Sequence, residues 1–225
     1  MSEVLIATNG YKDTRMAIEY GVWLAARMRT KITLLGVTEK LNPAAIDDHH
    51  PLEDIFADAV SLFKERGVEY SLEVCNGEAE QVIPEKANQG NFITVVSPLG
   101  RPAIRRWLTG RSIRPLMEKI VGPILYVPQL RLPVKKMLIS VGGLGYESVT
   151  ESLGFQVAVA SQAEVTILHV VPPSDLDYPS TREVRGHLKD LVETDTMPGR
   201  SLRKALELAK EAGLSAKVVA REGHI

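Results

Sequence analysis

Gly100 and Gly110, two glycines with nine residues between them, lie in the part of the sequence best suited to bind a phosphate group. Glycine lets the backbone approach a ligand closely, and the free N–H groups at the start of a following helix attract anions. Ser112 carries the hydroxyl of a typical N-cap for that helix. Arginine, whose guanidinium matches phosphate oxygens, recurs around the glycines at Arg101, Arg105, Arg106, Arg111 and Arg114. The stretch therefore predicts a phosphate-binding loop, and the alternative is a glycine turn with a solvated arginine face.

Other reactive residue types are too isolated to form a catalytic centre. The single cysteine, Cys75, excludes a disulfide within the chain and a CxxC metal site. Gly143 and Gly145 follow a strand in the second half, but Ser148 stands where a dinucleotide-binding loop needs its third glycine. The sequence places no serine–histidine–aspartate set and no pair of carboxylates together. We therefore expect no catalytic residues and no metal site.

The composition is that of a globular protein, with 225 residues, a mass of 24.7 kDa, 44% hydrophobic and 24% charged residues and a net charge of -1. This balance of charge argues against wholesale binding of nucleic acid. No apolar run approaches the ~20 residues that a membrane helix needs, and no charged leader precedes an apolar signal segment. We expect a cytoplasmic protein with neither a membrane nor a nucleic acid as its partner.

The sequence repeats itself, which sets the architecture. Shifted by 133 positions, residues 4–37 match residues 137–170, with identities that include Leu5/Leu138, Ile6/Ile139 and Gly21/Gly154. A second match, shifted by 146 positions, pairs Gly67 with Gly213 and Gly77 with Gly223. The difference of 13 positions predicts an insertion in residues 172–196, which we interpret as an exposed loop. The repeat predicts a first domain at 1–128, a linker at 129–133 and a second domain at 134–225 that lacks its last ~50 residues.

Strands and helices alternate within the first copy. The strands are expected at 4–8, 31–37, 68–74, 92–96 and 124–127, and the helices at 13–29, 51–66, 78–88 and 112–121, with Pro84 interrupting the third helix. This alternation predicts right-handed βαβ units and a parallel sheet, hence an α/β fold. Ligands of such sheets bind beyond the carboxyl ends of the strands, so the loops after Thr8, Val37 and Val96 are the candidate binding loops.

The repeat, the first strand and turn at 4–10 and the last strand of the first copy at 124–128 resemble a tandem universal stress protein of the UspA family. The resemblance covers essentially the whole chain. It implies two Rossmann-like domains of the adenine-nucleotide α-hydrolase-like type, with strand order 3-2-1-4-5 in the first and an incomplete second domain. It also implies a homodimer formed through the fifth strand, Ile124 to Val127.

The nucleotide-binding members of that family have a glycine, two residues, a glycine, nine residues, and then a glycine and a serine or threonine after the fourth strand. Gly100 and Gly110 match the second and third glycines, whereas Ser97 stands at the first and Arg111 at the serine or threonine position. Asn9 stands where the family usually has an aspartate near the adenine and ribose. The ligand-lining positions that the resemblance implies are Thr8, Asn9, Val37, Ser97, Gly100, Gly110, Arg111 and Ser112.

The resemblance implies a non-catalytic stress-response protein that binds ATP, with Mg²⁺, or a related nucleotide as a regulatory ligand in its first domain. One alternative is a dimerising interaction scaffold with a degenerate nucleotide site. Asn9, Ser97 and Arg111 all depart from the family pattern, and so does Gly142, which stands at the aspartate position in the second half. The other is an enzyme that uses adenine nucleotides, which the incomplete loop disfavours.

Overall fold

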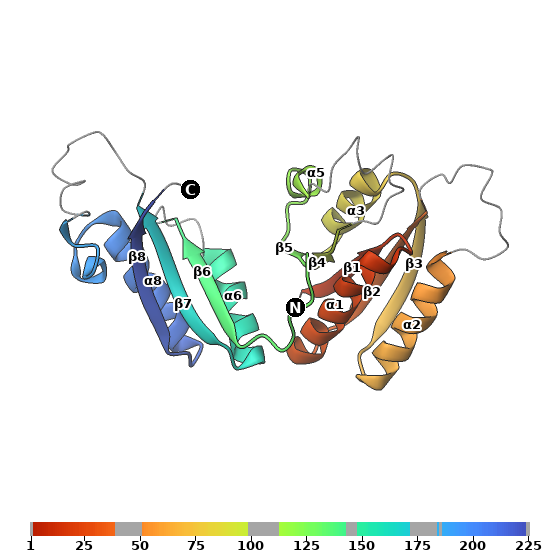
Figure 1. The fold of residues 1–225 in the computed structure, drawn as a ribbon, viewed down its shortest axis with the longest axis horizontal. Coiled ribbons are helices and arrows are strands. Elements are labelled where there is room, and N and C mark those ends of the chain that lie inside the picture. The colour runs from red at the N-terminus through yellow and green to blue at the C-terminus, as the bar shows by residue number, and fades with distance from the viewer. Residues whose placement is uncertain are drawn as a thin grey trace. The chain divides into compact units, whose positions relative to one another are not determined.

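The computed structural model describes residues 2–38, 51–98, 113–142, 148–171, 184 and 186–223. The chain forms two compact units, Met1–Leu132 and Pro133–Ile225, each with its own sheet (Figure 1). None of the helices in the described ranges is long and apolar enough to cross a lipid bilayer.

The first unit is a five-stranded parallel sheet in the order β3-β2-β1-β4-β5, which confirms the predicted order (Figure 1). Its strands are β1 (Glu3–Thr8), β2 (Ile32–Thr38), β3 (Tyr70–Asn76), β4 (Phe92–Val96) and β5 (Ile124–Tyr126). Its helices are the 3₁₀ helix η1 (Lys12–Thr14), α1 (Arg15–Met28), α2 (Pro51–Glu65), α3 (Ala79–Asn88) and α5 (Arg114–Met117).

Helices cover both faces of this sheet. A side chain added at Gly21 of α1 would meet Val4 and Ile6 of β1. The alternate residues of β1, Leu5 and Ala7, belong to a core cluster with Ile83 of α3 and Leu116 of α5. Because successive side chains of a strand point to opposite faces, α1 and α3 lie on opposite sides of the sheet. Burial on both faces explains why the central strands are nearly continuous apolar runs.

Pro84 does not interrupt its helix, so that detail of the prediction is wrong. The helix α3 runs from Ala79 to Asn88 with Pro84 inside it. A proline cannot donate a hydrogen bond to the carbonyl four residues earlier, which here belongs to Glu80. The ammonium of Lys119 donates to that carbonyl at 2.9 Å, so the helix continues past the proline with the oxygen satisfied.

The helix expected at 112–121 is shorter in the structure. It is a single turn, Arg114–Met117, with Ile113 at the N-cap position, and Ser112, the expected N-cap, lies outside the described residues. Asn88, at the end of α3, holds the segment that follows α5. Its side-chain amide donates to Lys119 O at 2.9 Å and its oxygen accepts from Val121 N at 3.0 Å.

The second unit has a parallel three-stranded sheet in the order β6-β7-β8. Its elements are β6 (Lys136–Val141), α6 (Ser148–Ser161), β7 (Glu164–Val171), the 3₁₀ helix η2 (Leu191–Glu193), α8 (Met197–Glu211) and β8 (Ala216–Glu222). Both ends of α6 lie 133 positions after those of α1, and both ends of α8 and β8 lie 146 positions after those of α2 and β3. The two offsets are the ones found in the sequence.

The shared pair of a glycine and an isoleucine marks a close contact between helix and strand in both units. A Cβ at Gly21 would lie 2.5 Å from Ile6 Cδ1, and a Cβ at Gly154 would lie 2.9 Å from Ile139 Cδ1. Any larger residue would push α1 away from β1, or α6 away from β6, unless the isoleucine moved. The glycines therefore set how closely the helices pack on the strands.

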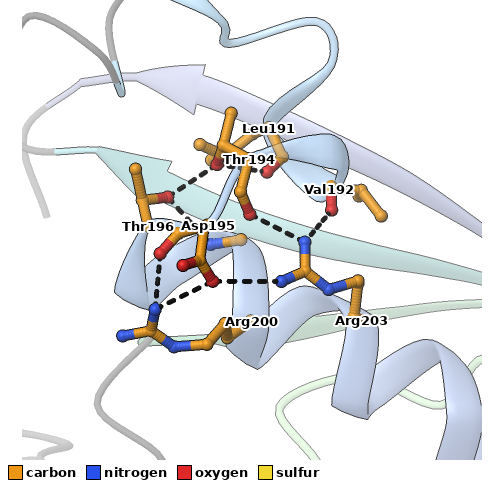
Figure 2. A network of polar contacts seen from close by, with 8 residues as sticks. Leu191, Val192, Thr194, Asp195, Thr196, Arg200 and Arg203 are labelled. Atoms are coloured by element: carbon orange, nitrogen blue, oxygen red, sulfur yellow. Dashed lines mark hydrogen bonds and ion pairs between the residues drawn. The ribbon is translucent and has the colours of Figure 1, made fainter.

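The described part of the predicted loop at 172–196, residue 184 and residues 186–196, is packed rather than wholly exposed, contrary to the prediction. The rest of that range lies outside the described residues. Leu191 is fully buried in the core of the second unit, and Val184 belongs to the same cluster. Arg203 of α8 donates to Thr194 O at 2.7 Å and also to Val192 O, as Figure 2 shows. Thr196 caps α8 by accepting from Gly199 N at 3.2 Å. These contacts depend on residues that come later in the sequence, in α8.

Candidate functional site

The candidate site lies at the carboxyl ends of β1 and β4, where the strand order reverses direction. From β1 the chain proceeds to β2 on one side, whereas β4 pairs with β1 on the other side. The loops that leave the two strands therefore diverge, which leaves the usual ligand position of an α/β sheet between them. Thr8 ends β1, Val96 ends β4 and Val37 is the penultimate residue of β2.

A chain of hydrogen bonds shapes the turn after β1. Thr14 Oγ1 donates to the carbonyl of Tyr11 at 2.6 Å, so its single proton is used there. The 2.6 Å contact between the Thr8 and Thr14 hydroxyls is then a bond that Thr8 donates. Thr8 Oγ1 in turn accepts from Gly10 N at 3.2 Å, and Gly10 has a φ of 84°, which favours glycine. Thr8 is thus both donor and acceptor within the turn.

Ser97 joins the end of β4 to the same turn. Its hydroxyl donates to Asp13 O in η1 at 3.0 Å, although the two residues are 84 positions apart in the sequence. Ser97 is 3% exposed and Thr8 is fully buried, so this junction excludes water. The structure therefore brings together the predicted residues Thr8, Asn9 and Ser97 around η1.

Of the remaining predicted positions, the structure describes Asn9 and Val37, and both are buried. Asn9 follows β1 directly and is buried, with 6% of its surface exposed. The side chain of Val37 lies in the hydrophobic cluster with Leu5 and Val96. Only the backbone of Val37 is therefore available to a ligand. The four positions of the predicted phosphate loop lie outside the described residues, namely Gly100, Gly110, Arg111 and Ser112.

Thr14 is the residue of this site that the sequence did not reveal. A threonine just before a helix reads as an N-cap, but the Thr14 side chain makes no cap hydrogen bond and instead contacts Thr8 and Tyr11. Its spacing of six residues from Thr8 matches neither a helix nor a strand period. We find no signal in the sequence alone that would have identified it.

The described part of the site is neutral. Its side chains are hydroxyls and one amide, which can hydrogen-bond to sugar hydroxyls or to the edge of a base but cannot act as a general base of ordinary strength. Across the described ranges, no group of three histidine, cysteine, aspartate or glutamate side chains could hold a metal ion. This arrangement suits binding better than chemistry.

The second unit is built differently at the equivalent place. Val141 and Gly142 take the positions of Thr8 and Asn9, and His169 takes that of Gly36. His169 is buried and its Nδ1 lies 2.9 Å from Val141 O. Because a carbonyl oxygen only accepts, Nδ1 carries the proton of this hydrogen bond. At the described positions, the second unit therefore has Val141 and His169 where the first has Thr8 and Gly36.

Comparison with solved structures finds the same fold in universal stress proteins. One from Archaeoglobus fulgidus DSM 4304 aligns with a TM-score of 0.65 and 13% identity, over 99% of this chain and 77% of that one. A protein assigned to the same group from Pseudomonas aeruginosa UCBPP-PA14 aligns with a TM-score of 0.63 and 15% identity, over 100% and 75% of the two chains. A protein of unknown function from Pseudomonas aeruginosa PAO1 aligns with a TM-score of 0.59 and 16% identity, over 100% of this chain and 74% of that one.

No family model and no curated protein matches the sequence. At these identities the likeness to the solved structures shows the fold. The sheet order β3-β2-β1-β4-β5, the parallel second sheet and the alignment over the whole length agree on it. This chain has the Rossmann-like α/β fold of the universal stress proteins.

Proposed function

We propose that this chain is a universal stress protein of the UspA family, with two such domains in tandem, and that its first domain binds ATP or a related nucleotide as a regulatory ligand. The proposal is for a stress-response protein that is not an enzyme. The observation that carries it is the Ser97 Oγ to Asp13 O hydrogen bond, which holds the end of β4 against the turn after β1. Two binding loops of the predicted site thereby meet at the switch point of the sheet.

Thr8 and Asn9 would contact the adenosine part of the ligand in this proposal. The backbone at Gly100 and Gly110, together with Arg111 and Ser112, would contact the phosphates, and Mg²⁺ would accompany ATP. The neutral character of Thr8 and Asn9 supports their part of the assignment, because a hydroxyl and an amide suit sugar hydroxyls and a base rather than phosphate.

A second candidate is an interaction scaffold whose nucleotide site has degenerated. The hydrogen bonds of Thr8 favour it, because its hydroxyl donates to Thr14 and accepts from Gly10 N within the turn after β1. A site whose polar groups already hydrogen-bond to one another binds a ligand with less favourable free energy than a site whose polar groups have no protein partner. In this alternative the two domains serve to hold partners together, and nucleotide has no effect.

We also propose that the chain forms a homodimer through residues 124–127. β5 is the outer strand of the first sheet and consists of three residues, Ile124–Tyr126. Val127 extends the pairing with a hydrogen bond to Val96 O at 2.8 Å. The N–H and C=O groups on the far side of an outer strand are available to a second strand.

The nucleotide proposal is tested on protein purified without added nucleotide. The protein is denatured and precipitated, and the supernatant is separated by anion exchange with absorbance at 260 nm. A stoichiometric adenine nucleotide is expected. An empty supernatant, together with no thermal shift at millimolar ATP, would favour the scaffold.

Glycine substitutions locate the binding. Gly100→Leu and Gly110→Leu are expected to abolish the bound nucleotide and the thermal shift by ATP. Gly186→Leu is the matched control, because a Cβ at Gly186 meets no atom within 4 Å. Nucleotide that binds unchanged in all three variants would refute the phosphate loop.

A further inference from the structure

A shallow depression of about 270 Å³ lies at the amino-terminal ends of the strands of the first sheet, where β2 and β3 begin. It is formed by the turn between α1 and β2 and by the turn between α2 and β3. The lining residues used below are Arg29, Thr30, Lys31, Arg66, Gly67 and Glu69. They are separate from the candidate site, which lies at the carboxyl ends of the strands.

Three cationic side chains surround this depression, namely Arg29, Lys31 and Arg66. One carboxylate, Glu69, also lines it, and Glu65 lies 3.7 Å from Arg66 Nε in an exposed ion pair. The lining thus has an excess of positive charge. Because a Cβ at Gly67 would meet no atom within 4 Å, the space above that glycine is open to a ligand.

The helices α1 and α2 do not need these cations as partners for the carbonyl oxygens of Ala25 and Phe63 in their last turns. Backbone N–H groups already donate to both oxygens, from Thr30 N to Ala25 O at 3.0 Å and from Val68 N to Phe63 O at 3.0 Å. Cations near a helix C-terminus are commonly explained by the helix dipole, so a comparison is needed to separate the two explanations.

The second unit supplies that comparison, because it has the same backbone at the same place. Gln162 has a φ of 55° where Arg29 has 52°. The bonds from Ala163 N to Ala158 O at 3.0 Å and from Leu214 N to Ala209 O at 2.9 Å repeat those of the first unit. The residues that replace the three cations are Gln162, Glu164 and Ala212. Two helices of the same length therefore end in the same way without the cations.

We propose that this depression binds a small phosphorylated anion, a phosphate monoester or a diphosphate. Arginine presents a planar fork of N–H donors to phosphate oxygens, and the lysine adds a point charge. A volume of about 270 Å³ is below the usual range for drug-sized ligands, which limits the ligand to a small molecule. The charges are exposed, so binding weakens with added salt.

Titration of the full-length protein with inorganic pyrophosphate, at low ionic strength and without Mg²⁺, tests the proposal. Two-dimensional NMR is expected to show saturable shifts of the Thr30 and Gly67 amide signals. The triple variant Arg29→Gln, Lys31→Glu and Arg66→Ala introduces the residues that the second unit carries, on a backbone that accepts them. It is expected to weaken pyrophosphate binding at least about tenfold.

The reverse variant Gln162→Arg, Glu164→Lys and Ala212→Arg is expected to create a second binding site, seen as new shifts at Gly213. The Gly100→Leu variant separates this site from the proposed nucleotide site, since it is expected to leave the shifts at Thr30 and Gly67 unchanged. The proposal is overturned if those shifts are absent in the native protein, if they persist in the triple variant, or if Gly100→Leu removes them.

Discussion

At the scale of single residues, Gly21 limits how closely α1 packs on the sheet. We predict that Gly21→Ala destabilises the first unit by about 1–3 kcal/mol, because the new methyl group overlaps Ile6 Cδ1. The better helix propensity of alanine offsets about 1 kcal/mol of this cost. Urea unfolding followed by tryptophan fluorescence measures it, since both tryptophans, Trp23 and Trp107, lie in the first unit.

The same cost should depend on Ile6. A Cβ at Gly21 would overlap two atoms of Ile6, Cδ1 at 2.5 Å and Cγ1 at 2.6 Å. Ile6→Ala removes both, so Gly21→Ala should cost less in the Ile6→Ala background than in the native protein. If the two substitutions are additive, the overlap seen in the structure does not determine the stability, and the prediction fails.

Asn9 makes a prediction about the ligand. Asn9→Asp is expected to lower the stability of the unliganded protein, because a carboxylate at a position only 6% exposed loses its hydration. It should raise the affinity for ATP about tenfold, because a charged acceptor binds a ribose hydroxyl more strongly than an amide does. Calorimetric titration with ATP checks this.

The matched control is Asn9→Leu, which has a similar size and cannot hydrogen-bond, and should weaken ATP binding. Equal affinities in the native protein and both variants would remove Asn9 from the nucleotide site.

At the scale of elements, β1 and β6 place the same residue in opposite surroundings. Leu5 of β1 is fully buried beneath α3, whereas Leu138, its counterpart in β6, is 63% exposed. Leu5→Ala should therefore cost about 2–5 kcal/mol, because it empties a packed core. Leu138→Ala should change the stability by no more than about 0.5 kcal/mol.

The two effects are measured separately. Tryptophan fluorescence in urea follows the first unit, and hydrogen exchange of peptides from β7 and β8 follows the second. Comparable losses from the two substitutions would mean that the exposed face of β6 is covered in solution.

The strands and helix ends that are determined by neighbouring residues could be predicted from the sequence. Continuous apolar runs identified β1, β2 and β4, because strands buried on both faces need no polar alternation. The helix expected at 51–66 is α2, Pro51–Glu65, and Gly67 after it has a φ of 62°, which glycine adopts readily. The general position of ligands in parallel sheets selected the loops after Thr8 and Val96. Within those loops, the family resemblance implied Asn9 and Ser97 as ligand-lining positions.

The errors concern contacts between distant parts of the chain. α3 continues through Pro84 because Lys119, far along the sequence, satisfies a carbonyl oxygen that the proline leaves free. Leu191 is buried because it packs in a cluster with Leu202 and Ala205 of α8. Arg203 of the same helix binds the carbonyl oxygens of Val192 and Thr194 beside it. Thr14 escaped notice because its partner, Thr8, belongs to another element and the contact follows no period. Local patterns carry no information about such pairs.

At the scale of the whole molecule, the outer strand β5 has the features of an interface. A depression of about 340 Å³ lies beside it, lined by Tyr20 of α1, by Leu125 and Tyr126, and by Arg131. Burial raises the pKa of the Tyr20 phenol, so this tyrosine stays neutral at physiological pH. Tyrosine and arginine are enriched in protein–protein interfaces, where they combine apolar area with hydrogen bonding.

We therefore predict that the protein is a homodimer in solution and that Leu125→Lys makes it a monomer, because a charged side chain would be buried against the partner strand. Light scattering coupled to size-exclusion chromatography measures the mass against the 24.7 kDa of one chain. Leu138→Lys is the matched control, since β6 is also an outer strand and carries a leucine that is already exposed. A native protein that is monomeric at high concentration contradicts the prediction. A dimer lost in Leu138→Lys and kept in Leu125→Lys would place the interface on β6 instead of β5.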